Sequence, residues 1–198
     1  MEFLDKKTIT MDKVLNKLDK FVLDFINILK KHSDYVIISG YVSILFGRSR
    51  ATEDVDLFIK QLDKAAFSKL YKELIKNKFW CLNAESLDEV YSYLKDGIAV
   101  RFAKNNKTIP NFEVKFAIKP LDLESFNDRI TVKISAGELK ISSLERQIAF
   151  KRYYLKSDKD IEDALHIEEV FKGKINKGLV LEYRKLIENG QIKNIKKQ

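Results

Sequence analysis

The spacing of apolar side chains predicts alternating helices and strands in the first two thirds of the chain. Three stretches repeat apolar residues every three or four positions, as a helix with one buried face does: 11–31, 63–78 and 86–95. Four others are short β-branched or alternating runs typical of strands: 34–38, 54–59, 98–102 and 112–118. The order of these elements favours a sheet covered by helices.

A short helix and a basic loop are predicted between the first two strands. Ser39-Gly40 follows the first strand, and residues 41–46 suit a short helix closed by Gly47. The loop Arg48 to Thr52 then leads into the second strand.

The last third of the chain changes character. Segments 130–134 and 138–142 predict a hairpin turning at Ala136-Gly137. From Ser143 the pattern is helical, in three pieces ending near 155, 171 and 188. Gly173 and Gly190 stop the second and third pieces, and we expect the lysine-rich tail 193–198 to be frayed.

These patterns predict the fold class α/β (α+β), with a mixed sheet flanked by helices. We expect an α/β domain with an N-terminal helix over 1–142 and a C-terminal helical part over 143–198 packed on it. No internal repeat or low-complexity linker separates the two parts.

The amino-acid composition indicates the cellular compartment of the protein and the sign of its net charge. The chain has 198 residues, 37 Lys and Arg against 29 Asp and Glu, and a net charge of +8. This charge attracts phosphate-bearing partners, although lysines on polar helix faces also serve solubility. A single cysteine, Cys81, excludes an intramolecular disulfide, and neither a signal-peptide core nor a membrane-length apolar stretch occurs. We expect a cytoplasmic protein that does not enter membranes.

Paired carboxylates are the first candidate chemistry. Asp54 and Asp56 are two residues apart in a strand, so both side chains lie on one face. Like charges this close repel unless a cation lies between them, and Mg²⁺ (or Mn²⁺) prefers such oxygen ligands. Glu113, on the polar side of strand 112–118, is a third carboxylate that could ligate a second metal or accept a proton.

Groups that can hold phosphates come just before the carboxylates. Ser39-Gly40 opens a helix, where backbone N–H groups and the helix dipole favour phosphate oxygens. Arg48 and Arg50 could clamp a triphosphate through bidentate contacts. The ordered combination predicts a nucleoside triphosphate (NTP) carried by a divalent metal.

The stretch SGYVSILFGRSRATEDVDLFI resembles the nucleotidyltransferase superfamily, and more closely its minimal and abortive-infection (AbiEii-like) families. FEVKFA and AFKRYYLKSDKDIEDALHI are similar to their third-carboxylate strand and Lys/Asp-x-x-Asp helical segment. The resemblance covers roughly residues 34–168. It implies a nucleotidyltransferase-like sheet, metal ligands at Asp54, Asp56 and Glu113, and triphosphate contact at Gly40. Ser39 replaces a frequent glycine, and Glu113 is longer than the usual aspartate.

The resemblance implies metal-dependent transfer of a nucleoside monophosphate from an NTP to a hydroxyl or amine acceptor. The motifs leave three classes of acceptor open: RNA, including a tRNA end, a protein, or a small molecule. If the protein is one half of a toxin–antitoxin pair, the other half would be its partner protein. One alternative is a non-catalytic nucleotide-binding or antitoxin-like partner. A second is a basic RNA-binding protein in which Asp54 and Asp56 are incidental.

Each motif also has a purely structural interpretation. An Asp-x-Asp motif alone is typical of exposed strands and capped turns, and Glu113 could pair with Lys115 or Lys119. The remaining candidates are interpreted as helical surface or packing residues: Lys151, Asp160, Asp163, His166 and Cys81.

Overall fold

The structure, a computed structural model, describes residues 1–189. The predicted stop at Gly190 and the tail at 193–198 lie outside these residues.

A nine-stranded mixed sheet runs through the molecule in the order β1-β2-β8-β9-β3-β4-β7-β6-β5. Its strands are β1 (Glu2–Asp5), β2 (Thr8–Thr10), β3 (Tyr35–Ile37), β4 (Asp54–Ile59), β5 (Phe79–Cys81), β6 (Val100–Lys104), β7 (Asn111–Phe116), β8 (Ile130–Ile134) and β9 (Gly137–Ile141). The interior strand β4 pairs antiparallel with β3 and parallel with β7.

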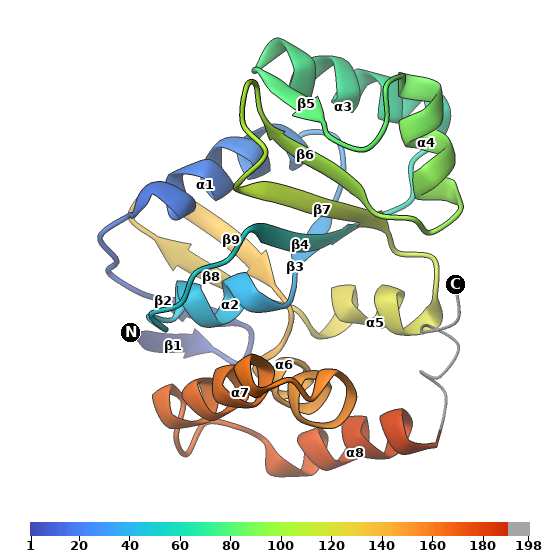
Figure 1. Cartoon of the computed structure of the whole chain (residues 1–198). Helices are drawn as coiled ribbons and strands as arrows, with labels where there is room; N and C mark the ends of the chain where they lie inside the picture. Colours follow the sequence, from blue (N-terminus) through green and yellow to red (C-terminus); the bar gives the residue numbers. More distant parts are fainter. Residues whose placement is uncertain (190–198) are drawn as a thin grey trace.

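Helices cover both faces of this sheet (Figure 1). On one face lie α1 (Lys17–Leu29), α3 (Lys64–Lys76) and α4 (Leu87–Lys95). On the other lie α2 (Gly40–Leu45), α5 (Pro120–Asp128), α6 (Leu144–Ala149), the π-helix η1 (Phe150–Leu155), α7 (Asp158–Val170) and α8 (Lys177–Glu188). The C-terminal helices contact the rest of the protein where α7 packs against α2. The proposed domain boundary at residue 142 stays a prediction.

Aromatic side chains form the centre of the core between β7 and α1. Phe112 stacks on Phe25 and Phe21, with ring centroids 4.0 and 4.8 Å apart. Phe79 meets the edge of Phe25 at 5.1 Å. Because β7 alternates, this packing of Phe112 directs its neighbour Glu113 to the opposite face.

The predicted helices and strands are confirmed, with shifted bounds in several of them. The strand expected at 98–102 lies at Val100–Lys104. The helix expected from residue 11 begins only at Lys17, because Asn16 and Asp19 form a reciprocal cap, and Val14 is 95% exposed. The strand expected to reach residue 118 ends at Phe116. Ile118 is therefore exposed, whereas Ala117 packs beneath α5.

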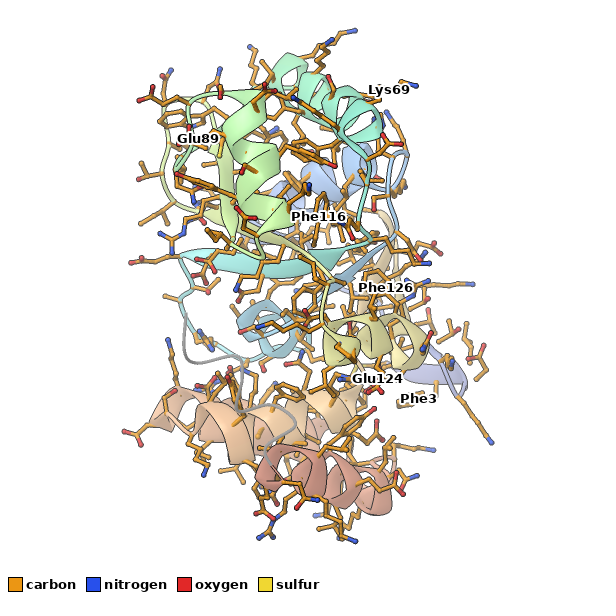
Figure 2. All side chains as sticks on the ribbon, turned by 90° about the vertical axis from the view of Figure 1, so that its right-hand side faces the viewer. Phe3, Lys69, Glu89, Phe116, Glu124 and Phe126 are labelled. Carbon is orange, nitrogen blue, oxygen red and sulfur yellow. The ribbon has the colours of Figure 1, made fainter. Side chains whose placement is uncertain are left out.

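The buried side of α5 is a small second core. Ala117, Val36 and Phe126 pack together there. Figure 2 shows Phe116, from β7, and Phe126, from α5, on opposite sides of the sheet. Four elements were not predicted: β1, β2, β5 and α5.

Candidate active site

Asp54 and Asp56 lie on the sheet face that carries α2. Val55 and Leu57, which alternate with the two aspartates along β4, are buried in the main core. The two carboxylates therefore point to the opposite face of the sheet. Asp56 lies directly opposite Glu113 on the parallel strand β7. The structure thus brings all three predicted carboxylates to one face of two adjacent strands.

The Asp56 carboxyl group lies in an electrostatically unfavourable place for a negative charge. Burial, followed by the charges of Asp54 and Glu113, raises its pKa from 3.8 to about 6. The nearby Ser39 hydroxyl and the charge of Lys115 act in the opposite direction but do not cancel this effect. A cation at this carboxylate would remove the repulsion.

Glu113 is held by an arginine that the sequence analysis missed. Arg101, directly across from it on β6, donates from Nε and Nη2 to Glu113 Oε1 at 2.8 and 2.5 Å. The purely structural interpretation expected Glu113 to pair with Lys115 or Lys119. Its carboxylate pairs with Arg101 instead. Matching the alternation of 98–102 to that of 112–118 in an antiparallel pair could have suggested this partner.

The donor set fits a hard divalent cation at two of the three carboxylates. Within residues 1–189, no three His, Cys, Asp or Glu side chains stand in an arrangement that could itself hold a metal ion. Asp54 and Asp56 together supply a pair of oxygen donors, while Glu113 is directed to Arg101. Mg²⁺ is commonly bound by one or two carboxylates, with substrate phosphates and water completing its shell.

The start of α2 combines a strained serine with a tightly packed glycine. Ser39 has φ +64° and ψ −138°, a backbone conformation that favours glycine. Gly40 is buried, and a Cβ added there would lie 3.1 Å from Arg50 Nη2. Ser39 also lies near Asp56, because Ile38 N donates to Asp56 O at 2.9 Å. The turn, Arg50 and the carboxylates therefore adjoin one another.

Arg48 and Arg50 bind a buried aspartate of α7. Asp163 is 0% exposed and accepts from Arg48 Nη1 at 2.6 Å and Arg50 Nη1 at 2.5 Å. Glu162, which is 65% exposed, adds a second contact to Arg48. The arginines proposed as a triphosphate clamp are thus anchored to the C-terminal helices, and a role for them toward phosphate stays a prediction.

Lys151 extends the same network from the π-helix η1. Its ammonium group, 1% exposed, donates to Asp163 at 2.7 Å and to Asp160 at 3.2 Å. Of the two interpretations given to Lys151, Asp160 and Asp163, helical surface or packing residues, the structure confirms the second, because all three are buried. They do pack in the interior, but as an ion-pair network, and π-helical turns occur frequently at functional sites.

Two other residues are structural, as expected. Cys81 is buried in the core, and burial raises the pKa of its thiol. His166 on α7 contacts the carbonyl oxygen of Phe46 through Nε2 at 3.1 Å. Neither lies among the three carboxylates.

The mixed sheet carries adjacent carboxylates beside a helix-opening glycine, and these groups have the chemistry to bind a divalent cation and phosphate oxygens. The sequence pattern of the family described as "Nucleotidyl transferase of unknown function (DUF2204)" matches residues 20–198. The chain belongs to this family, and transfer of a nucleotidyl group is its general chemistry.

Solved structures show the same fold at low sequence identity. An antigenic nucleotidyltransferase-like protein from Paracoccidioides brasiliensis has a TM-score of 0.53 and 18% identity, with 91% of each chain covered. The antibiotic-resistance factor ANT(2'')-Ia has a TM-score of 0.56 and 11% identity, covering 89% of this chain and 94% of its own.

A third neighbour is the lincosamide antibiotic adenylyltransferase LnuA, solved with lincomycin bound. Its TM-score is 0.53 at 13% identity, covering 79% of this chain and 98% of its own. These likenesses confirm the nucleotidyltransferase-like fold.

Curated proteins include no match to the chain. Across residues 1–189, no helix has the length and apolarity needed to cross a membrane.

Proposed function

We propose that the protein transfers a nucleoside monophosphate from an NTP to a hydroxyl or amine acceptor and releases pyrophosphate, with a divalent cation held by Asp54 and Asp56. The observation that carries this proposal is the placement of these carboxylates on one strand face, beside the Ser39-Gly40 turn. The acceptor oxygen or nitrogen forms a bond to the α-phosphorus as the bond to the β-phosphate oxygen breaks.

Each side chain has a distinct part in this proposal. Asp54 and Asp56 hold the cation, which offsets the negative charge of the phosphates. Backbone N–H groups at Ser39-Gly40 approach the triphosphate, and Arg50, already packed against Gly40, supplies positive charge there. Glu113 accepts the acceptor's proton on Oε2, the oxygen that Arg101 does not contact.

The test compares wild type with Asp56→Asn in the presence of each α-labelled NTP, Mg²⁺ or Mn²⁺, total cellular RNA and a protein lysate. Asparagine keeps the size of the side chain while removing one anionic ligand. Label transferred by wild type and lost in the variant supports the proposal, and the labelled fraction identifies the acceptor as RNA or protein. A variant as active as wild type would overturn the assignment of the metal site.

One observation favours a second candidate, a non-catalytic nucleotide-binding partner protein of the toxin–antitoxin type. Arg101 neutralises Glu113, the carboxylate available for proton transfer. This alternative predicts metal-dependent NTP binding without pyrophosphate release in any acceptor mixture. Arg101→Gln separates the two, because freeing Glu113 would speed an enzyme but leave a binding protein without product.

A further inference from the structure

We propose that a basic groove beside the carboxylates binds the phosphate backbone of a single-stranded nucleic acid. The groove, of about 740 Å³, lies between the start of α1, the loop before β4 and the loop joining β6 to β7. These three segments come together on one side of the molecule (Figure 1). No residue of the groove was among the predicted site residues except Arg50.

The first argument is charge. Cationic side chains reach the groove from all three segments: Lys17, Lys20, Arg50, Lys104 and Lys107. Among the described residues that line it, Asp24 alone is acidic, and it pairs with Lys104 at 3.4 Å. Arg50 is paired with Asp163, so the positive charge that the groove offers to a ligand comes from the remaining three lysines.

Three of these lysines are available to a ligand. Within residues 1–189, no ion pair engages Lys17, Lys20 or Lys107, and all three are exposed. A small polyamine acceptor would be repelled here. A chain of phosphates, in contrast, can neutralise several lysines at once and release counterions.

The second argument is the apolar lining between the charges. The apolar side chains that line the groove are Leu18, Phe21, Ile44, Ile109 and Pro110. Single-strand binding sites combine a positive groove that follows the backbone with aromatic side chains on which bases stack. Here the contact surface for the bases would be mainly aliphatic, because Phe21 is 8% exposed and stacks on Phe112. A free triphosphate could contact the lysines of this groove, but it is too short to contact all of its lining residues at once.

The third argument is position. Thr52 lines the groove, and its hydroxyl donates to Asp54 O at 3.0 Å and lies 3.4 Å from Asp54 Oδ1. A neighbouring basic depression of about 400 Å³ continues past Arg50 to Arg48 and Lys13. A strand in the groove would thus place one end next to Asp54, the first of the three carboxylates. The inference that this end of the strand is the acceptor rests on the proposed function. The inference that the groove binds a strand does not depend on it.

The test is fluorescence anisotropy with a labelled single strand, as RNA and as DNA of the same sequence, over a series of salt concentrations in metal-free buffer without NTP. The variant Lys17→Gln/Lys20→Gln removes two charges from exposed positions of α1. The matched control is Lys69→Gln/Lys72→Gln, with the same spacing on α3. Figure 2 shows Lys69 on the outer surface, and neither Lys69 nor Lys72 lines the groove. Glutamine retains helix propensity, so both variants should fold.

We expect the groove variant to bind more weakly than wild type and the control to bind as wild type does. The slope of log affinity against log salt should fall by about 1.4, since each single-strand phosphate contact contributes about 0.7. Lys107→Gln, on a separate loop, should lower the slope by about half as much. The RNA and DNA arms show which strand the groove prefers.

Three results would overturn the proposal: no binding of either strand, equal losses in the groove and control variants, or a groove variant that loses only affinity for Mg²⁺-NTP. Asp56→Asn keeps strand binding if the groove acts independently of catalysis. Failure of nucleotidyl transfer with intact strand binding would therefore refute the proposed function and leave the groove in place.

Discussion

Replacing Asp163 tests how strongly the buried charge network holds the C-terminal helices to the loop before β4. In Asp163→Asn, the contacts from Arg48, Arg50 and Lys151 lose their shared anion, and Lys151 keeps only Asp160 at 3.2 Å. Removing one partner of a buried ion pair leaves uncompensated charge and costs about 3–5 kcal/mol. For a chain of 198 residues, this corresponds to a fall in Tm of about 6–20 °C.

Thermal and guanidinium unfolding, followed by circular dichroism, measure this effect. Glu162→Gln is the matched control, because the exposed carboxylate next to Asp163 also pairs with Arg48 and should contribute less than about 1 kcal/mol. Adding Lys151→Met to Asp163→Asn should restore part of the stability by removing the unpaired ammonium. A loss in Asp163→Asn no larger than that in Glu162→Gln would refute the reasoning.

Three further predictions concern the site. The pKa of Asp56 is raised to about 6, so the folded protein retains a proton that the unfolded chain releases. In metal-free buffer, stability should fall as pH rises from about 4 to 6, by up to about 3 kcal/mol, and unfolding of Asp56→Asn across this range should lack that fall. Ser39→Gly should raise stability by about 1 kcal/mol by relieving the positive φ, whereas a similar gain in Ser39→Ala would contradict this cause. Gly40→Ala should displace the Arg50 guanidinium and weaken Mg²⁺-NTP binding in a calorimetric titration, while Gly178→Ala on α8 should not; equal affinities would refute the contact.

The sequence predicted elements whose signals are local. The alternation Asp54 to Ile59 gave the bounds of β4 and the shared face of its two carboxylates. In contrast, β1 and β2 have only four and three residues, and β2 joins the rest of the sheet through its pairing with the distant strand β8. Such long-range pairing has no signature within a short window of sequence.

The sequence predicted the carboxylates of the site, but not which arginines pair with carboxylates there. Two-residue periodicity places Asp54, Asp56 and Glu113 on polar faces. The pairing of Arg101 with Glu113, and of Arg50 with Asp163, depends on which strands and helices become neighbours. The helix α5 was missed despite Pro120 at its first turn, which is a recognised start signal.

The position of β1 and β2 in the sheet has a consequence for the order of assembly during synthesis. These strands leave the ribosome long before β8, which begins at Ile130 and connects them to the rest of the sheet. The segment from α1 to β7 can form its aromatic core before that point, because its strands pair among themselves. We therefore expect β1 and β2 to dock late, after the core between α1 and β7 has formed, so that these two strands complete the sheet and do not nucleate it.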